Sequence, residues 1–346
     1  MTTDTINQAV SSDVFGQLAS LQRVALAHPR AGEDFLRLQA DHPKLEFLLA
    51  NGADWQSQVA TAQAVLLGRS LPIDELLDDA PQLRWIHTIG AGVDRLLVPR
   101  LRDSGVVLTN SSGVHAINIA EHVLALALSF ARQLHVLGKA QARSEWLGPG
   151  VKGPYIPLPK VFELEGQTLA VIGLGAIGQA LSRKADALGL RVLGVRRSLR
   201  GELVPGVSQH YSVEDLDAAL AQADHVAITL PLTPQTQGLF NAERLSRIKK
   251  GAYIYNIGRG AIIDSEALLE ALHSGHIAGA GLDVTDPEPL PPDSPLWQHP
   301  DVIITAHTSG STPHNARRTL DIFCDNLGRS LRGEALRNVV DKQLGY

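Results

Sequence analysis

The stretch of sequence that decides the fold is LAVIGLGAIG, residues 169–178. Its apolar start is typical of a buried parallel strand, and the residues that follow it have the pattern of a helix. In this context Gly173 would permit a tight turn, and Gly175 would let a pyrophosphate approach the backbone. Gly178 would let the helix pack closely on the strand. The pattern predicts a dinucleotide-binding turn, and a turn made tight by packing alone is the alternative.

The amides of Ala176 and Ile177 would then face the phosphates at the helix N-terminus, where the helix dipole favours an anion. The end of the next strand bears on the choice of dinucleotide. A carboxylate there would bind the ribose hydroxyl of NAD, but the sequence has Arg196, Arg197 and Ser198. Guanidinium and hydroxyl groups bind a 2′-phosphate instead. This favours NADP(H), with NAD(H) as the alternative if both arginines only face solvent.

Two series of short apolar runs alternate with helical or polar stretches, which predicts parallel sheets with helical crossovers. The first series indicates strands near residues 24–27, 45–49, 64–67, 83–86 and 106–109. The second indicates strands near residues 169–172, 192–195, 226–230, 253–256, 281–284 and 302–305, enough for a dinucleotide-binding sheet. We expect one long helix over 117–142, a Pro- and Gly-rich loop over 148–159 and a last helix over 313–331.

The composition narrows the class of protein. A chain of 346 residues is long for one core, so two domains are expected. The net charge of −5 gives no reason to expect nucleic acid as a partner. The single Cys324 lies in a helical pattern, which favours a packed thiol in a reducing compartment. The polar first residues lack the pattern of a signal peptide, and no apolar run is long enough for a membrane span. We expect a cytoplasmic protein with no membrane partner, and no metal-ligand motif is visible.

Three polar residues, Arg259, Glu288 and His307, each follow a short β-branched run and should stand where a strand ends. A cation, a carboxylate and an imidazole beside a dinucleotide site are what reversible hydride transfer to a 2-keto acid requires. His307 would donate the proton, because imidazole titrates near neutral pH. Glu288 would hold its other ring nitrogen, and Arg259 would bind the substrate carboxylate and carbonyl. Taken singly, each could be an ordinary surface or loop residue.

The order and spacing of these segments resemble the D-isomer-specific 2-hydroxyacid dehydrogenase family, in particular its glyoxylate/hydroxypyruvate reductase-like branch. The resemblance covers nearly the whole chain. The intervals from Arg259 to Glu288 and from Glu288 to His307 suit that family. Four further segments match it: GAGVD at 90–94, AEH at 120–122, LPLTPQT at 230–236 and NVVD at 338–341.

The resemblance implies an α/β fold of two doubly wound parallel-sheet domains. A Rossmann cofactor domain, residues 116–309, would be inserted into a flavodoxin-like substrate domain, residues 1–115 and 310–346. It implies that the backbone amides of Ala91 and Gly92 bind the substrate carboxylate. It also implies a homodimer formed through the long helix. The same resemblance adds cofactor contacts from Leu230, Pro231, Thr236, Ile257 and Asp283, the last orienting the nicotinamide carboxamide.

The function that follows is NADPH-dependent reduction of a small 2-keto acid such as glyoxylate, hydroxypyruvate or pyruvate to the D-2-hydroxy acid. Two alternatives share the fold: a dinucleotide-sensing corepressor, and a phosphite-type dehydrogenase. A formate dehydrogenase is less favoured, because that branch would have Gln in place of Glu288. Arg69 is a further candidate for the site. His115 is given no role, and Glu121 and His122 are expected to fix helix packing.

Overall fold

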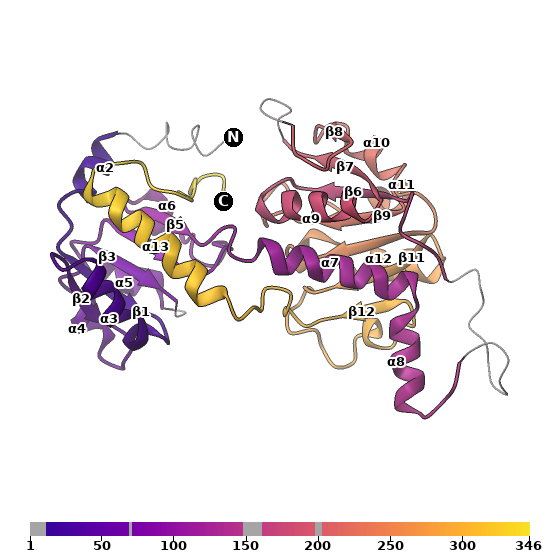
Figure 1. Ribbon diagram of the computed structural model, residues 1–346, viewed down its shortest axis with the longest axis horizontal. Helices are drawn as coiled ribbons and strands as arrows, with labels where there is room; N and C mark the ends of the chain where they lie inside the picture. Colours follow the sequence, from indigo (N-terminus) through magenta and orange to yellow (C-terminus); the bar gives the residue numbers. More distant parts are fainter. Residues whose placement is uncertain (1–11, 69–70, 148–160, 198–202) are drawn as a thin grey trace. The chain divides into compact units, whose positions relative to one another are not determined.

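The computed structural model describes residues 12–68, 71–147, 161–197 and 203–346. Arg69, Ser198 and the Pro- and Gly-rich segment expected over 148–159 lie outside the described residues. The chain forms two compact units, one built from Met1–Val114 and Pro313–Tyr346 and the other from His115–Thr312 (Figure 1). Each unit contains one parallel β-sheet, which confirms the expected fold class.

The sheet of the first unit has five strands in the order β2-β1-β3-β4-β5, and all neighbours are parallel. This is the flavodoxin-like order, in which the chain starts inside the sheet and reverses direction once. The strands are β1 (Arg23–Ala27), β2 (Glu46–Leu49), β3 (Ala64–Leu67), β4 (Trp85–Thr88) and β5 (Val107–Asn110).

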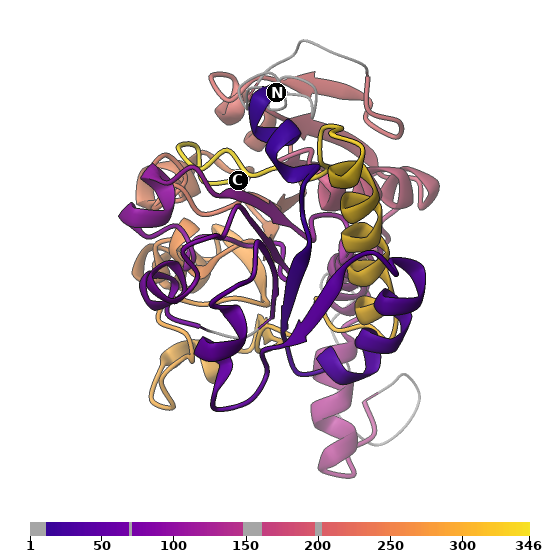
Figure 2. The same ribbon diagram turned by 90° about the vertical axis from the view of Figure 1, so that its left-hand side faces the viewer.

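Helices cover both faces of this sheet, because successive strand residues point to opposite sides. Val24, Leu26 and Trp85 pack under one layer: α2 (Ser12–Leu18), α3 (Ala31–Asp41) and α13 (Asn315–Leu331). Ala25 and Ile86 pack under the other: α4 (Trp55–Val59), α5 (Ile73–Asp79) and α6 (Pro99–Asp103). Figure 2 turns this unit toward the viewer, with yellow α13 beside indigo α2, which it contacts. The C-terminal helix thus completes the first unit.

The sheet of the second unit has seven parallel strands in the order β12-β11-β10-β9-β6-β7-β8. From β6 onward this is the Rossmann order with one further strand at the edge. The strands are β6 (Thr168–Ile172), β7 (Arg191–Val195), β8 (Gln209–Tyr211), β9 (His225–Ile228), β10 (Ala252–Asn256), β11 (Ile277–Leu282) and β12 (Val302–Ile304).

Two details of this sheet differ from the sequence prediction. Strand β8 was not predicted, because its three residues Gln-His-Tyr contain no apolar run. Strand β11 was expected over 281–284 but begins at Ile277 and ends at Leu282. Its alanines and glycines have low β-propensity, so only the tertiary pairing with β10 shows where the strand starts.

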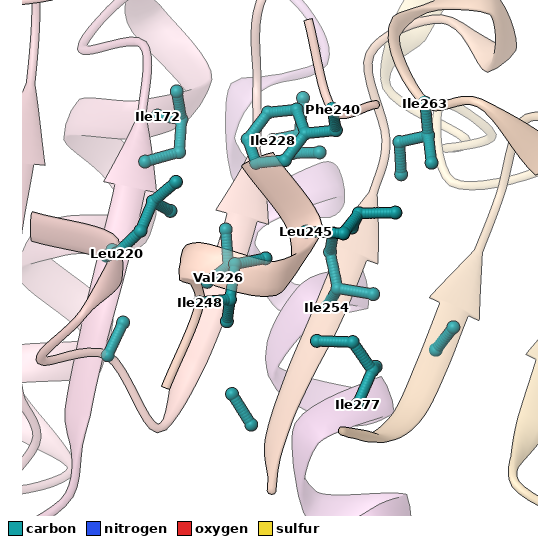
Figure 3. Close-up of a cluster of buried hydrophobic side chains, with 14 of the residues drawn as sticks. Ile172, Leu220, Val226, Ile228, Phe240, Leu245, Ile248, Ile254, Ile263 and Ile277 are labelled. Atoms are coloured by element: carbon teal, nitrogen blue, oxygen red, sulfur yellow. The ribbon is translucent and has the colours of Figure 1, made fainter. Parts of the chain in front are cut away.

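Helices also cover both faces of the second sheet. One layer contains α7 (Ala116–Ala131) and α9 (Ala176–Ala187), which bury Leu169 and Val171. The opposite layer contains α10 (Leu216–Leu220), α11 (Ala242–Arg247) and α12 (Ser265–His273). Figure 3 shows this second core, in which Ile172, Val226 and Ile254 of the strands pack against helical side chains such as Leu220. The short 3-10 helices η2 (Gly260–Ile262) and η3 (Pro295–Trp297) complete the unit.

The single long helix expected over 117–142 is wrong. The structure has two helices, α7 and α8 (Leu134–Ala142), which meet at Gln133. Gln133 adopts a left-handed conformation with φ 55°, and its side-chain amide donates to Phe130 O at 2.8 Å. The left-handed backbone of Gln133 ends α7, and the side-chain bond satisfies a carbonyl of its last turn. The sequence contains no Gly or Pro there to signal the break.

Within the described ranges, no helix is both long and apolar enough to cross a membrane. No group of three or more His, Cys, Asp or Glu residues in the same ranges could hold a metal ion. Cys324 packs half-buried against the core of the first unit. Burial raises the pKa of its thiol to about 11, so the thiolate is scarce near neutral pH.

Each unit buries one histidine completely. His87 contacts Thr109 Oγ1 at 2.7 Å through Nδ1 and Ser111 Oγ at 3.2 Å through Nε2. His225 contacts Tyr255 Oη at 2.9 Å through Nδ1. Burial lowers the pKa of His87 to about 3 and that of His225 to about 4. Both are therefore neutral in the folded protein near pH 7.

We predict that acid destabilises the protein through these two groups. The unfolded histidines titrate near the ordinary pKa of about 6.5. The contribution of these neutral histidines to the free energy of unfolding is therefore fully present above that pH. It is lost as the pH drops toward 3–4, by roughly 2–5 kcal/mol for each group. His87→Gln keeps a polar side chain but cannot titrate, so its urea midpoint should decrease less than that of the wild type between pH 7 and pH 4. The exposed His314→Gln should follow the wild type, and parallel curves for all three proteins would contradict the prediction.

Candidate active site

The register of the second sheet places the ends of its strands along one edge. Ile172 pairs with Ile228, and Ile228 pairs with Asn256. Asn256 in turn pairs with Leu282, and Leu282 with Ile304. Because all strands are parallel, the loops that follow these residues lie side by side. The first residues of these loops are Gly173, Thr229, Ile257, Asp283 and Thr305.

The glycine turn after β6 is shaped by two close constraints. Gly173 has φ 105°, and a Cβ on Gly178 would lie 2.0 Å from Gly173 O. A Cβ on Gly175, by contrast, would point into open space. In the described part of the chain, the amides of Gly175, Ala176 and Ile177 donate to no protein acceptor. The turn thus presents several amides at the start of α9, which suits the anionic pyrophosphate of a dinucleotide.

A hydroxyl that sequence reasoning missed ties this turn to the next loop. Thr229 Oγ1 donates to Gly173 O at 2.6 Å. In the following loop, Thr236 Oγ1 donates to Pro231 O at 2.7 Å and accepts from Thr233 N at 2.8 Å. Thr236 therefore braces the loop from within, while Pro231 is exposed at its surface. A hydroxyl directly after a strand was the available signal for Thr229.

The two arginines after β7 differ in their surroundings. Arg196 is half-buried, and its backbone N donates to Tyr211 O of β8 at 3.1 Å, while Arg197 is exposed. His210 of β8 faces Arg196: burial and then the positive charge of Arg196 lower the pKa of His210. Strand β8 thus helps to shape the end of β7, a contribution that the sequence did not reveal.

The loop after β10 is built around a buried side-chain amide. Asn256 is 1% exposed, and its Nδ2 donates to Arg259 O at 2.9 Å. Its Oδ1 accepts from Gly258 N at 3.1 Å. Asn256 therefore holds the backbone of the loop at Gly258 and at Arg259. The side chain of Arg259 is half-buried, and its Nη1 donates to Gly258 O at 2.9 Å. The side chain of Ile257, in the same loop, is buried in the core between the sheet and the layer of α7 and α9.

The structure brings His307 and Glu288 together. His307 Nδ1 lies 2.6 Å from Glu288 Oε1, and both side chains are partly exposed. This contact fixes the ring plane and directs Nε2 away from the carboxylate. The pair has the geometry of an acid–base imidazole oriented by a carboxylate. Arg259 comes from the neighbouring loop along the same edge.

The backbone beneath His307 is strained. Ala306 and His307 have φ values of 47° and 57°, in the left-handed region that residues with a Cβ rarely adopt. Each such residue costs on the order of 1–3 kcal/mol and persists only where its surroundings determine it. The backbone N of His307 donates to Asp283 O at 2.6 Å. The strain therefore occurs in a segment that the end of β11 holds in place.

The carboxylate of Asp283 is the centre of that arrangement. Asp283 is 2% exposed, and both of its carboxylate oxygens accept hydrogen bonds from the loop that carries His307. Its expected contact with the nicotinamide carboxamide stays a prediction. The donors are Thr305 Oγ1 at 2.6 Å, Thr308 N at 2.9 Å, Ser309 N at 3.1 Å and Ser309 Oγ. His122 of α7 adds a contact from Nε2 to Thr305 Oγ1 at 3.0 Å. These polar residues, which sequence reasoning largely missed, set the position of His307.

The two polar residues of the AEH segment have different partners. Glu121 Oε1 pairs with Lys184 Nζ of α9 at 2.8 Å, while His122 turns to the Asp283 network. His115 precedes α7, and its ring lies against Gly310. In the first unit, the loop after β4 contains half-buried Ala91 and exposed Gly92.

Comparison with known proteins identifies the family. The family model described as D-isomer specific 2-hydroxyacid dehydrogenase, NAD binding domain, matches residues 124–309. A glyoxylate/hydroxypyruvate reductase B from Pectobacterium carotovorum is 36% identical over 288 residues, which span 83% of this chain and 88% of that protein. The chain belongs to the D-isomer specific 2-hydroxyacid dehydrogenase family. Like the other members, it is an oxidoreductase.

Solved structures of the 2-hydroxyacid dehydrogenase family share the whole fold. The protein from Xanthobacter autotrophicus, in complex with NADPH and MES, is 32% identical with a TM-score of 0.77, covering 94% of this chain and 100% of its own. The NADPH-dependent glyoxylate/hydroxypyruvate reductase from Sinorhizobium meliloti, in complex with NADP and sulfate, is 29% identical with a TM-score of 0.78 and the same coverage.

We predict that Asp283→Asn impairs this dehydrogenase although the side chain keeps its size. The NH2 group of the asparagine would replace one carboxylate oxygen and face at least one N–H or O–H donor of the loop. That donor would stay buried without an acceptor, and the loop of His307 would be held less firmly. A loss of 1–3 kcal/mol at this point corresponds to a decrease in kcat of roughly 5- to 150-fold. Steady-state kinetics test this against Asp293→Asn, an exposed carboxylate in the same unit. Equal kcat values for both variants would show that the network does not position His307.

Proposed function

We propose that the protein is an NADPH-dependent reductase of small 2-keto acids of the glyoxylate, hydroxypyruvate or pyruvate type, giving the D-2-hydroxy acid. The observation that supports this most is the 2.6 Å contact between His307 and Glu288. Both residues follow strands that end on the same sheet edge as the glycine turn, and the Asp283 carboxylate accepts hydrogen bonds from the loop of His307. Two of the relatives are named glyoxylate/hydroxypyruvate reductases, which supports this substrate class.

The roles of the three residues follow from their chemistry. NADPH, when bound, supplies the hydride that reaches C2 of the keto acid. His307 donates a proton from Nε2 to the carbonyl oxygen, so that C=O becomes CH–OH. Glu288 stabilises the imidazolium before the transfer and keeps the ring in place. Arg259 binds the substrate carboxylate and carbonyl and stabilises negative charge on the oxygen. The amides of Ala91 and Gly92 hold the same carboxylate.

The proposed cofactor-binding residues follow successive strands of the sheet edge and contact different parts of the dinucleotide. The turn from Gly173 to Gly178, with the amides of Ala176 and Ile177, holds the pyrophosphate. Arg196, Arg197 and Ser198 hold the 2′-phosphate, and relatives bound to NADPH and NADP support that choice over NAD(H). The ribose side is lined by Leu230, Pro231 and Thr236. Ile257 adds a cofactor contact at the end of β10, and Asp283 orients the nicotinamide carboxamide while its carboxylate also holds the loop of His307.

We further propose that the protein acts as a homodimer. Apolar side chains remain exposed on α7, on α8 and just beyond α8, which is unfavourable in a lone subunit. Examples are Ile117 and Leu128 on α7, Leu134 on α8 and Trp146 after it. A second copy of the chain would cover them.

The reaction is tested by following NADPH oxidation with glyoxylate, hydroxypyruvate and pyruvate. His307→Ala should lower kcat/KM by roughly 10²- to 10⁴-fold, the usual contribution of general acid catalysis, while the affinity for NADPH stays unchanged. The matched control is His314→Ala, which removes an exposed histidine outside the site. Undiminished turnover in His307→Ala would refute its acid role. NADPH binding without turnover of any keto acid would favour a dinucleotide sensor, and oxidation of phosphite instead would favour the phosphite-type enzyme.

The cofactor preference is tested at the end of β7. Arg196→Asp combined with Arg197→Ala should move the ratio of kcat/KM for NADPH and NADH toward NADH by roughly 10- to 100-fold, because charged hydrogen bonds to the 2′-phosphate are lost. Arg191→Ala removes an exposed arginine at the opposite end of the same strand and should leave the ratio unchanged. An unchanged ratio in the double variant would show that these arginines only face solvent.

A further inference from the structure

The loop after β4 in the first unit is held by two hydrogen bonds to its carbonyl oxygens. Ser111 N donates to Gly90 O at 3.0 Å. Asn110 Nδ2 donates to Ala91 O at 2.7 Å. Two successive peptide groups of the loop are therefore tied to the segment that ends β5, one by a backbone amide and one by a side chain.

These two bonds determine where the amides of the loop point. In a planar trans peptide the N–H is directed opposite to the C=O. With Gly90 O turned toward Ser111, the Ala91 N–H points away from it. Because Ala91 O is turned toward Asn110, the Gly92 N–H points to the same side of the loop as the Ala91 N–H. Across the described residues neither of these two amides donates to a protein group, and Gly92 is exposed. Two adjacent N–H groups on one side of a loop form an anion-binding concavity.

Asn110 is itself rigidly held. It is 7% exposed, and its Oδ1 accepts from Ser112 N at 3.1 Å, which fixes which side of the amide faces Ala91. Its backbone O accepts from Asn338 Nδ2 at 3.1 Å, and its backbone N donates to Asn338 O at 3.1 Å. The returning C-terminal segment therefore anchors Asn110. Donation by Nδ2 also polarises the Ala91–Gly92 peptide, which makes its N–H a better donor.

We propose that Asn110 is a positioning residue for substrate binding: it orients the Ala91–Gly92 peptide so that two amides hold the carboxylate of the keto acid. This inference rests on the proposed function for its substrate. It adds a residue that touches no substrate atom and sets affinity for the carboxylate through the loop. The hydride and proton transfers depend on the second unit and are expected to change little.

The test is Asn110→Asp in the full-length protein. The carboxylate keeps the size of the side chain and its acceptor for Ser112 N, but it faces Ala91 O with a negative charge and no donor. We expect KM for glyoxylate to rise roughly 10- to 100-fold, while kcat falls less than about threefold. Calorimetry with NADPH present should show the same weakening for oxalate, a two-carbon acid that cannot be reduced, and an unchanged affinity for NADPH. Asn110→Ser, which is too short to reach Ala91 O, should show the same separation if Asn110→Asp does not fold.

The matched control is Asn326→Asp. Asn326 is also buried in the first unit, and it also donates to a backbone carbonyl and accepts from a backbone amide, both of Arg337. It should lower stability without changing KM or oxalate affinity. If the wild type reduces keto acids but the Asn110 variants keep its KM and oxalate affinity, the inference is overturned and the proposed function stands. If the wild type reduces none, the proposed function fails. In that case only the oxalate titration tests the inference about Asn110. The inference is overturned if the wild type does not bind oxalate or if the variants bind it equally well.

Discussion

Parallel strand register is the constraint on which the candidate site of the second unit depends. Every neighbouring pair from β12 to β8 is parallel, so the loops that follow the strands all emerge at one edge. The row from Ile172 through Asn256 to Ile304 places the glycine turn, the Arg259 loop and the His307 loop in a fixed order along it. A shift of one residue in β11 or β12 would turn Asp283 or Thr305 to the opposite face and dissolve the network that holds His307.

Both units use buried polar side chains to hold exposed functional groups. Asp283 and Asn256 are almost completely buried, and each bonds to the backbone of the loop it supports. Asn110 does the same in the first unit. Burying such groups is unfavourable unless they are hydrogen-bonded, and here they have partners on the loops themselves. The bonds of Asp283 offset the strain of Ala306 and His307 and hold the loop that carries the partly exposed imidazole.

Secondary structure was predictable where an apolar run and a turn residue coincide. The glycine turn after β6 satisfies this condition, and β12 ends one residue before its expected end, whereas β11 was misplaced at both ends. Strand β8 has no such run, and its place comes from pairing with Leu193 to Val195 of β7. The break at Gln133 was also invisible, because a glutamine in the left-handed conformation is stabilised by its own contact to Phe130 rather than by intrinsic preference.

The sequence by itself determined the fold class, the glycine turn and the residue types of the candidate site, because periodicity and motif spacing are local properties of the chain. It also pointed to Arg259, Glu288 and His307, whose spacing resembles one family. Only the tertiary structure decided that His307 meets Glu288 at 2.6 Å and that Asp283 faces the His307 loop. Only it showed that Asn110 Nδ2 donates to Ala91 O. Most of those contacts join residues far apart along the chain. Their geometry therefore exists only after the strands have paired and the polar side chains have been buried.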